Sequence, residues 1–296
     1  MKNLFLCIKL VIISIFCKLV ATLNKLPSGE IDTFARIAAI RYARKLGWAR
    51  AFLLFVNPIS SVRYFEFDFV KRKLGKLDSQ KILDISSARL FGIYLASKYP
   101  KIKYQMINPD VNDVEETNRC VTAIGNLNNF SVKQANALNL PYKDSTFDFV
   151  ITISVVEHID GSGDSKAMRE MWRVLKPGGR LIITTHVSSK YIVEYRGFDQ
   201  YNLGIKRKRR KYFFQRIYDE KQLKERIFKP IRTEPKIVEI WGEKEKGWFN
   251  KYVKRWIKNK WRETVYDPCY MINQFKKFNE IKELPGSGVI GMVFQK

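Results

Sequence analysis

The chain has 296 residues, 46% of them hydrophobic, with a formal net charge of +25 at pH 7. This length allows one large domain or two small ones with a sizeable core, and the composition is ordinary for a soluble protein. Four cysteines without close spacing exclude a zinc ligand set and a disulfide framework and favour a reducing cytoplasm: Cys7, Cys17, Cys120 and Cys269.

The positive charge is concentrated in the two flanks of the chain. Residues 1–78 hold 14 Lys or Arg against 5 Asp or Glu, and residues 201–296 hold 25 against 11. Residues 79–200 are nearly neutral, with 15 against 13. Such a distribution predicts a partner that carries phosphates or an anionic membrane surface.

The N-terminal stretch LFLCIKLVIISIFCKLVATL, Leu4 to Leu23, is about as long as a membrane span. Lys9 and Lys18 interrupt it, and charges inside a span are unfavourable. Four interpretations therefore stay open: a helix lying at the membrane surface or packed peripherally, a true span, a cleaved signal, or a buried core helix.

Residues 30–76 are predicted to be helical, because small and apolar residues recur at helical spacing in DTFARIAAIRYARKLGWARAFLLF. Pro58 breaks this run, and a second segment ends in the basic KRKLGK. Residues 1–78 thus form a predicted helical N-terminal region in front of the main domain, associated with a membrane in the first two interpretations above.

From Lys81 onward, short Ile- and Val-rich strands alternate with helices of ten or more residues. Connections of this length give a parallel sheet covered on both faces. We therefore predict an α/β fold with a doubly wound, Rossmann-like, seven-stranded and mostly parallel sheet. Residues 79–296 form this domain, in which KIVEIWGE and GVIGMVFQK are the closing strands, 201–212 a basic loop and 245–283 a helical C-terminal insertion.

Polar and small residues follow the predicted strands, where ligands bind in open parallel sheets. These strand ends are Asp84 to Ala88, Asn108 to Asp110, Asn136 to Leu138, Ser154 to His158, and His186. Since the carboxyl ends of parallel strands meet at one edge, we expect all five groups to form a single rim.

Two longer segments carry a family resemblance: NALNLPYKDSTFDFVITISVVEHI and MREMWRVLKPGGRLIIT. Their Leu-Pro, Phe-Asp-x-Val and Arg-Val-Leu-Lys-Pro-Gly-Gly elements resemble, in order and spacing, those of class I S-adenosylmethionine-dependent methyltransferases. The resemblance is closest to the ubiquinone and menaquinone methyltransferases and covers about residues 79–188. It implies S-adenosylmethionine as the cofactor and methyl transfer as the activity.

The family places an acidic residue before a Gly-x-Gly-x-Gly turn that approaches the cofactor. Asp84 is that acid, while Ser86 and Ala88 occupy glycine places. Ser86 and Ser87 can offer hydroxyls to the carboxylate or amino group of the cofactor. The alternative is a closed turn in a protein that kept the fold and lost its activity.

The resemblance also assigns the other cofactor-binding positions. Asn108 stands where the family has an acid for the ribose hydroxyls, with Asp110 two residues on, and Asn136 replaces the aspartate that pairs with adenine. Amide oxygens can still accept these hydrogen bonds. The predicted cofactor-binding set is completed by Ala137, Leu138 and Ser154.

His158 and His186 are the only histidines, and both follow predicted strands. A base is needed only if the acceptor is a hydroxyl, and histidine suits that role. We therefore predict both as candidate catalytic residues, with a structural tie between loops as the alternative. No metal site is expected, because Ile153 stands where related metal-binding enzymes have an acid.

Two basic segments remain. KRKRRK, residues 206–211, is either a solvated loop or a phosphate clamp. On a helix over 247–261, lysines and Arg255 lie opposite one face formed by Phe249, Tyr252, Val253, Trp256 and Ile257. This pattern is typical of an interfacial membrane helix, although a lid helix packed on the sheet or a base-stacking surface has the same pattern.

The sequence thus predicts a cytoplasmic S-adenosylmethionine-dependent methyltransferase, peripheral to the inner face of the membrane. The expected reaction is O-methylation of a small-molecule, glycan or lipid-linked acceptor. An RNA methyltransferase is a less favoured alternative, because no recognisable nucleic-acid module is present. A second alternative is a non-catalytic, membrane-docked scaffold with a degenerate fold.

Overall fold

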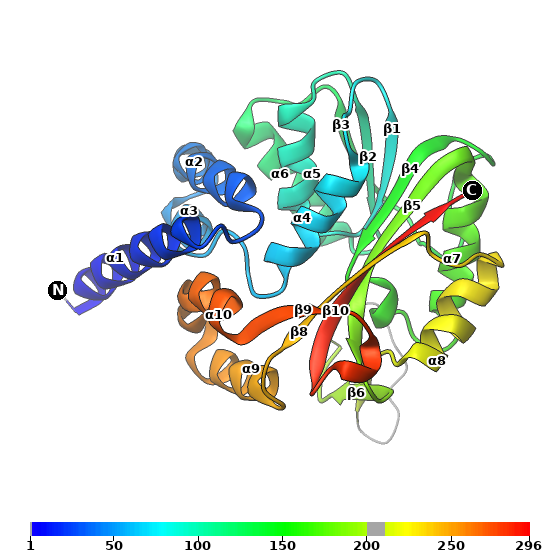
Figure 1. Ribbon diagram of the computed structural model, residues 1–296. Helices are drawn as coiled ribbons and strands as arrows, with labels where there is room; N and C mark the ends of the chain where they lie inside the picture. Colours follow the sequence, from blue (N-terminus) through cyan, green and yellow to red (C-terminus); the bar gives the residue numbers. More distant parts are fainter. Residues whose placement is uncertain (1, 200–210) are drawn as a thin grey trace.

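A central eight-stranded sheet organises the protein in a computed structural model that describes residues 2–199 and 211–296 (Figure 1). Its strand order is β3-β2-β1-β4-β5-β10-β8-β9. The first five strands run parallel, whereas β10 is antiparallel to β5 and β8, and β9 is antiparallel to β8. The strands are β1 (Lys81–Ile85), β2 (Lys103–Asn108), β3 (Phe130–Gln134), β4 (Phe147–Ile153), β5 (Leu175–Ser188), β8 (Ile237–Glu243), β9 (Phe275–Phe278) and β10 (Ser287–Gln295).

Helices cover both faces of this sheet, because its central strands are apolar on both sides. One hydrophobic core lies beneath α4, α5 and α6, and a second lies beneath α7 and the short helices that follow β7. The doubly wound, Rossmann-like fold is therefore confirmed. The covering helices are α4 (Arg63–Leu74), α5 (Arg89–Lys98), α6 (Val111–Ile124), α7 (Gly163–Val174) and α8 (Glu220–Leu223), with the short helical turns η1 (Val156–His158), η2 (Lys224–Phe228), η3 (Lys229–Ile231) and η5 (Ile281–Glu283).

The strand count differs from the predicted seven. The eighth strand, β9, lies inside the predicted helical insertion 245–283, where Phe275 is buried and Lys276 and Lys277 are exposed. Four residues are too few to show a period of two in the sequence. A separate two-stranded sheet, β6 (Ile192–Arg196) with β7 (Tyr212–Ile217), follows β5. Of the predicted basic loop 201–212, residues 201–210 lie outside the described part of the chain.

Four helices precede the sheet: α1 (Lys2–Leu23), α2 (Gly29–Lys45), α3 (Trp48–Val56) and α4. The helical run predicted up to Pro58 is split at Gly47, which has φ +92°. Phe69 and Val70 of α4 share a core with Ile82 of the sheet. The N-terminal helices and the sheet therefore pack as neighbours, and the domain boundary at residue 78 stays a prediction.

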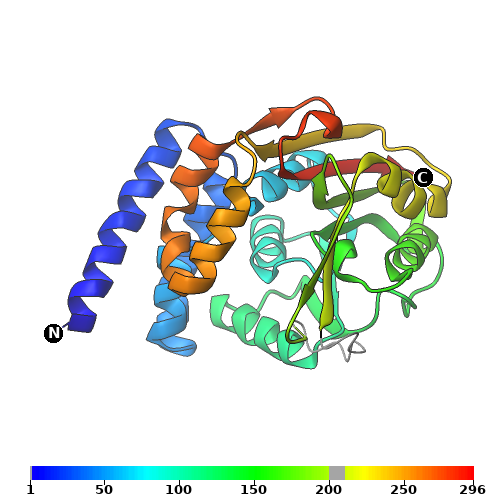
Figure 2. The same cartoon turned by 90° about the horizontal axis from the view of Figure 1, so that it is seen from below.

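The C-terminal insertion packs beside the N-terminal helices (Figure 2). It consists of α9 (Trp248–Asn259), the 3-10 helix η4 (Lys260–Tyr266) and α10 (Asp267–Gln274). Buried Asp267 joins the two segments, because its Oδ2 accepts the N–H of Ser61 at 2.7 Å and the hydroxyl of Tyr252 at 3.0 Å. The segment before α4 and the C-terminal insertion are thus joined through Asp267.

Candidate active site

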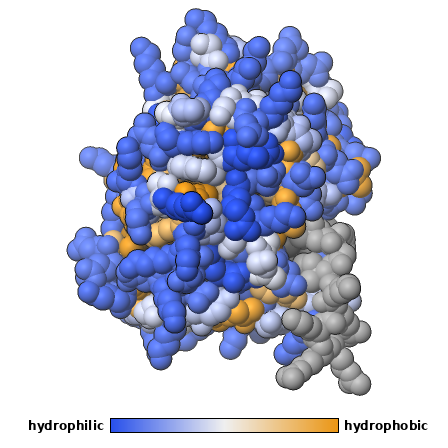
Figure 3. All heavy atoms as spheres, turned by 90° about the vertical axis from the view of Figure 1, so that its right-hand side faces the viewer, coloured by the Kyte–Doolittle hydropathy of each residue, from blue (hydrophilic) through white to orange (hydrophobic). Residues whose placement is uncertain are grey.

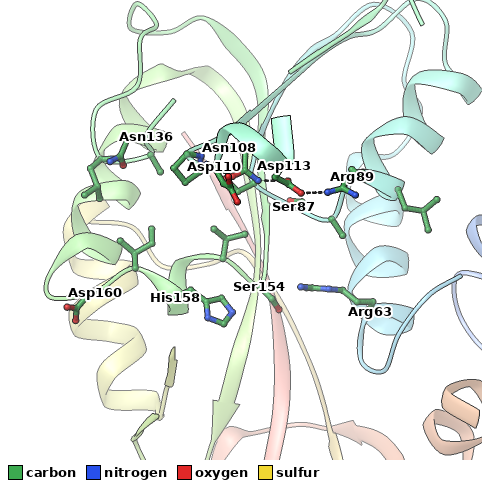
Figure 4. A pocket seen from close by; sticks show the side chains of 18 residues that line it. Arg63, Ser87, Arg89, Asn108, Asp110, Asp113, Asn136, Ser154, His158 and Asp160 are labelled. Atoms are coloured by element: carbon green, nitrogen blue, oxygen red, sulfur yellow. Dashed lines mark hydrogen bonds and ion pairs between the residues drawn. The ribbon is translucent and has the colours of Figure 1, made fainter. Parts of the chain in front are cut away.

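A cavity of about 720 Å³ opens at the carboxyl edge of the parallel strands (Figure 4). Its volume falls in the range of about 300–1,000 Å³ that small-molecule sites occupy. Ten of the twelve predicted site residues line it: Ser86, Ser87, Ala88, Asn108, Asp110, Asn136, Ala137, Leu138, Ser154 and His158. The single rim expected from the strand ends is therefore present, without Asp84 and His186.

The turn after β1 keeps an open course although it lacks the expected glycines. Ser86 has φ +54°, a conformation that glycine adopts without strain. Its hydroxyl donates to the carbonyl oxygen of Ile107 at 3.0 Å, and its backbone N–H donates to the same oxygen at 2.9 Å. The hydrogen of this hydroxyl is used within the protein, so the contact of Ser86 with a cofactor stays a prediction.

Ser87 also links two strand ends. Its Oγ accepts the N–H of Ile153 at 3.1 Å, and its own N–H donates to Asp84 at 3.0 Å. Asp84 is fully buried beneath the turn and also accepts the hydroxyl of Tyr104 at 2.5 Å. Burial raises the pKa of Asp84 to about 6, although the Ser87 and Tyr104 hydrogen bonds oppose this shift. Asp84 therefore shapes the turn and does not line the cavity, contrary to the predicted contact with a cofactor.

Polar side chains at the end of β2 form hydrogen bonds within the same segment and with α6. Asn108 Nδ2 donates to Asp113 at 2.6 Å, and Asn108 Oδ1 accepts the N–H of Asp110 at 3.0 Å. Asp113 also pairs with Arg89, and both line the cavity. The sequence reasoning missed this pair. An acid, Asp113 in the first turn of α6, thus lies beside Asn108.

The loop after β3 forms the opposite wall of the cavity. Asn136 is exposed, and its Oδ1 accepts the N–H of Leu138 at 2.9 Å. This bond fixes the orientation of the amide, and the second lone pair of its oxygen can accept a further hydrogen bond. Ala137 and Leu138 add an apolar surface beside it. A flat, apolar ligand group with a hydrogen-bond donor fits this wall.

The N-terminal helices contribute two residues to the end of β4, neither of which the sequence reasoning identified. Glu66 of α4 is fully buried and accepts hydrogen bonds from Ser154 at 2.5 Å, from Thr184 at 2.7 Å and from Arg63 at 2.8 Å. Burial opposes ionisation of Glu66, but Arg63, His186 and the two hydroxyls together hold its pKa below the usual value. Arg63 itself lines the cavity.

His158 lies on the cavity wall in η1, with its Nδ1 2.8 Å from the carbonyl oxygen of Phe214 in β7. Because a carbonyl oxygen only accepts, Nδ1 carries the hydrogen. Burial lowers the pKa of His158 to about 3, despite that hydrogen bond. The imidazole is therefore neutral at pH 7 and a weak general base. The predicted alternative, a tie between the strand end and a neighbouring segment, describes this geometry.

His186 does not line the cavity. Its ring lies 6.3 Å from that of Phe249 in α9, and burial lowers its pKa below the usual value, with the charge of Glu66 acting in the opposite sense. The predicted placement of both histidines at one ligand edge is therefore wrong for His186. Strand β5 continues past the end of β4, where His186 pairs with Val289 of β10, so this residue lies away from the other strand ends.

A family model described as a methyltransferase domain matches residues 93–183. The ubiquinone/menaquinone biosynthesis C-methyltransferase UbiE of Edwardsiella ictaluri is 29% identical over 139 residues, which is 44% of this chain and 52% of that protein. UbiE of Haemophilus ducreyi is 33% identical over 114 residues, or 37% and 42%. Residues 93–183 of the chain therefore match a methyltransferase domain.

The methyltransferase domain also resembles a solved structure. The crystal structure of MccD protein has a TM-score of 0.53 and 15% identity, and the match covers 80% of this chain and 99% of that one. At this identity the likeness shows the fold alone. The chain spans about half the length of the curated relatives it matches.

The methyltransferase cavity fits the parts of S-adenosylmethionine. The turn at Ser86 to Ala88 and acidic Asp110 both line the cavity, and the apolar wall at Ala137 suits a base. Among residues 2–199 and 211–296, no group of three His, Cys, Asp or Glu side chains is arranged to hold a metal ion.

Proposed function

We propose that this protein transfers a methyl group from S-adenosylmethionine to a small-molecule acceptor. The observation that carries this proposal is the open cavity at the strand ends, which the resemblance to methyltransferases assigns to the cofactor. The cofactor supplies a methyl group already activated on a sulfonium, so the protein mainly orients the partners and excludes water.

We assign the parts of the cavity as follows. Asp110 accepts a ribose hydroxyl, since only its Oδ1 is used to cap α6 through the N–H of Asn112 at 2.9 Å. Asn136 accepts the adenine amino group, with Ala137 and Leu138 against the ring. Ser154 and His158 then mark the end at which the acceptor enters.

We propose oxygen as the methylated atom, and the state of His158 narrows the class of acceptor. A neutral histidine with a pKa of about 3 removes protons poorly at pH 7. An acceptor hydroxyl must then ionise with little help from the protein. A phenol, with a pKa near 10 as in tyrosine, does so far more readily than a sugar hydroxyl. A quinone-like acceptor in its reduced, phenolic form is therefore favoured over a glycan.

Calorimetric titration of the full chain with S-adenosylhomocysteine tests the activity class. We expect saturable binding in wild type and loss of binding in Ala88→Phe, which fills the turn. Val238→Phe is the matched control, since Val238 is 44% exposed on β8, away from the cavity. A flat titration in wild type would favour the scaffold alternative. Retention on RNA that persists at raised salt would favour the RNA alternative.

We further propose that this cytoplasmic protein docks on an anionic membrane through α1. The helix contains a stretch, Leu4–Leu23, that is long and apolar enough to cross a membrane, yet only 22% of that stretch is buried. We define its lipid face by eight apolar side chains, each at least 50% exposed: Leu4, Phe5, Ile8, Ile12, Ile15, Phe16, Leu19 and Leu23.

The outward face of α1 is largely apolar, unlike that of a surface helix of a soluble protein, and its inward face includes polar groups. Ser14 is buried and donates to the carbonyl oxygen of Val56 at 2.9 Å, and Lys18 pairs with buried Asp32 at 2.7 Å. Lys18, one of the two lysines that interrupt the predicted span, is therefore satisfied by the protein, whereas Lys9 is exposed. The inward face of α1 combines these polar groups with buried Leu10 and Cys17, and a bilayer would stabilise the apolar outward face.

The side of the molecule opposite α1 and the lysines of α9 both support membrane binding at the α1 end. The side of the molecule opposite α1 is mostly hydrophilic, with small scattered apolar areas (Figure 3). Lysines of α9, at the same end as α1, are exposed and suit anionic headgroups. In α9, Tyr252 is buried while Trp256 and Ile257 are 40% and 62% exposed, so this helix packs one ring into the protein and exposes a smaller apolar tip.

A further inference from the structure

We infer that Arg63 binds the carboxylate of the amino-acid part of S-adenosylmethionine. This inference rests on the proposed function and adds a ligand subsite contributed from outside the matched methyltransferase domain, which begins at residue 93. Arg63 opens helix α4 of the N-terminal region. The N-terminal helices thus complete the cofactor site in addition to covering the sheet.

The protein fixes one edge of the Arg63 guanidinium. Nη1 donates to Glu66 Oε2 at 2.8 Å and to the carbonyl oxygen of Ile153 at 3.1 Å. Within the described residues, no hydrogen bond engages Nε or Nη2. The side chain points toward Ser154 across the cavity (Figure 4), which leaves donors on its other edge for a ligand.

The Nε and Nη2 side of the Arg63 guanidinium lies near the part of the cavity assigned to the amino-acid end of the cofactor. Ile153 donates its N–H to Ser87 and accepts Arg63 on its carbonyl, so the arginine lies beside the turn after β1. The proposed ribose and adenine contacts, Asp110 and Asn136, follow other strands. A carboxylate placed at the turn end meets the guanidinium, whose planar fork matches its geometry.

The charges of the cavity support the same assignment. Two arginines line it, and Arg89 is occupied by Asp113 and by Thr117 at 3.2 Å. Arg63 shares its charge with buried Glu66 but retains unused donors. The pair adds no net charge to the cavity, which suits the zwitterionic amino-acid group of the cofactor.

Calorimetry with two nucleosides tests the inference. S-adenosylhomocysteine carries the carboxylate, whereas 5′-(3-aminopropylthio)-5′-deoxyadenosine lacks it and keeps the amine. We expect wild type to prefer the first by about tenfold to a hundredfold, since a charge-assisted hydrogen bond accounts for that ratio. Arg63→Met should abolish the preference while binding of the second nucleoside stays unchanged, and Arg63→Lys should restore part of it.

Two controls keep the outcomes separate. Arg63→Met leaves buried Glu66 without a cation, so the double variant Arg63→Met with Glu66→Gln tests the same loss in a neutral setting. Arg41→Met removes an arginine of α2 that donates to the carbonyl of Ile124 at 3.0 Å, away from the cavity, and should keep the preference. A preference retained in Arg63→Met overturns the inference alone. If wild type binds neither nucleoside, the proposed function fails with it.

Discussion

The hydroxyl of Ser86 and its backbone N–H both donate to one acceptor, the carbonyl oxygen of Ile107, at 3.0 and 2.9 Å. This shared acceptor ties the turn after β1 to the end of β2. A left-handed conformation disfavours serine by about 1 kcal/mol, and a hydrogen bond of this kind contributes about the same amount. The serine can therefore keep the course that a glycine would take.

Substitutions at Ser86 should separate these two effects. Ser86→Gly loses the hydroxyl bond but relieves the backbone strain, so we expect stability within about 0.5 kcal/mol of wild type and unchanged binding of S-adenosylhomocysteine. Ser86→Val should lower stability by about 2 kcal/mol or more, because a β-branched residue is strained at positive φ. Urea unfolding and calorimetry check both. Equal stability of the valine variant would contradict the account.

Removal of Glu66 should destabilise the protein strongly. Glu66→Ala leaves Arg63, Ser154 and Thr184 without their common acceptor, and breaking a buried ion pair in this way costs about 3–5 kcal/mol. Thermal unfolding measures the effect. Glu225→Ala is the control, because its pair with Lys229 is exposed and should contribute less than about 1 kcal/mol. Similar losses in the two variants would show that Glu66 is not the centre of this cluster.

His158 should remain neutral over the physiological pH range. Its pKa of about 3 predicts the Nδ1–H tautomer in nitrogen NMR spectra from pH 8 down to about 4. The sign for stability follows, because the unfolded chain takes up this proton near pH 6.5 and the folded chain does not. Stability linked to His158 is thus present above pH 6.5 and falls below it. His186→Gln assigns the resonances, and protonation near pH 6 would refute the prediction.

Glu157 should make stability fall as pH rises. It is fully buried, neither carboxyl oxygen has a hydrogen-bond partner among the described residues, and burial followed by the charge of Glu66 raises its pKa to about 7. Between about pH 4.5 and 7 the folded state holds a proton that the unfolded state releases, so stability linked to Glu157 declines over this window.

Glu157→Gln isolates that contribution, because the amide imitates the protonated acid. We expect the variant to match wild type near pH 5 and to exceed it by about 2–3 kcal/mol at pH 8. Urea unfolding at a series of pH values measures the difference. A difference that does not change with pH would rule out a raised pKa at this position.

The lipid face of α1 should govern membrane binding. We expect wild type to float with phosphatidylglycerol vesicles. The double variant Ile12→Glu with Phe16→Glu should stay at the bottom of the gradient, because each apolar side chain buried in the membrane contributes about 1.5–3 kcal/mol to binding. Ile237→Glu, at a 39% exposed position on β8, is the matched control. Trp256→Glu tests α9 separately. Two results would exclude membrane binding by the lipid face. One is that the double variant floats as well as wild type. The other is that wild type does not float and the double variant loses self-association.

The sequence predicted the parallel sheet well, because each buried strand is an uninterrupted apolar run followed by a helix of regular length. Its rim followed from the same pattern, since parallel strands end at one edge. Strand β9 was not predictable, because its four residues show no alternation of buried and exposed positions. Its place beside β8 also depends on how the insertion folds back, which no local pattern indicates.

The missing parts of the site depend on distant residues. Glu66 meets Ser154 and Thr184 across separations of 88 and 118 residues, and no local pattern indicates such contacts. The same holds for Lys18, which interrupts an apolar segment in the sequence but has buried Asp32 as its partner in the fold. Asp113 could have been predicted more easily, because an acid in the first turn of the helix after β2 lies near the strand end.

Strand β10, residues 287–295, lies between β5 and β8 and pairs with both. Until residues 287–295 are synthesised, β8 therefore has no neighbour on its inner side and β5 has none beyond β4, so both strands expose unpaired edges. We expect even short deletions inside 287–295 to leave these two edges open and to promote aggregation.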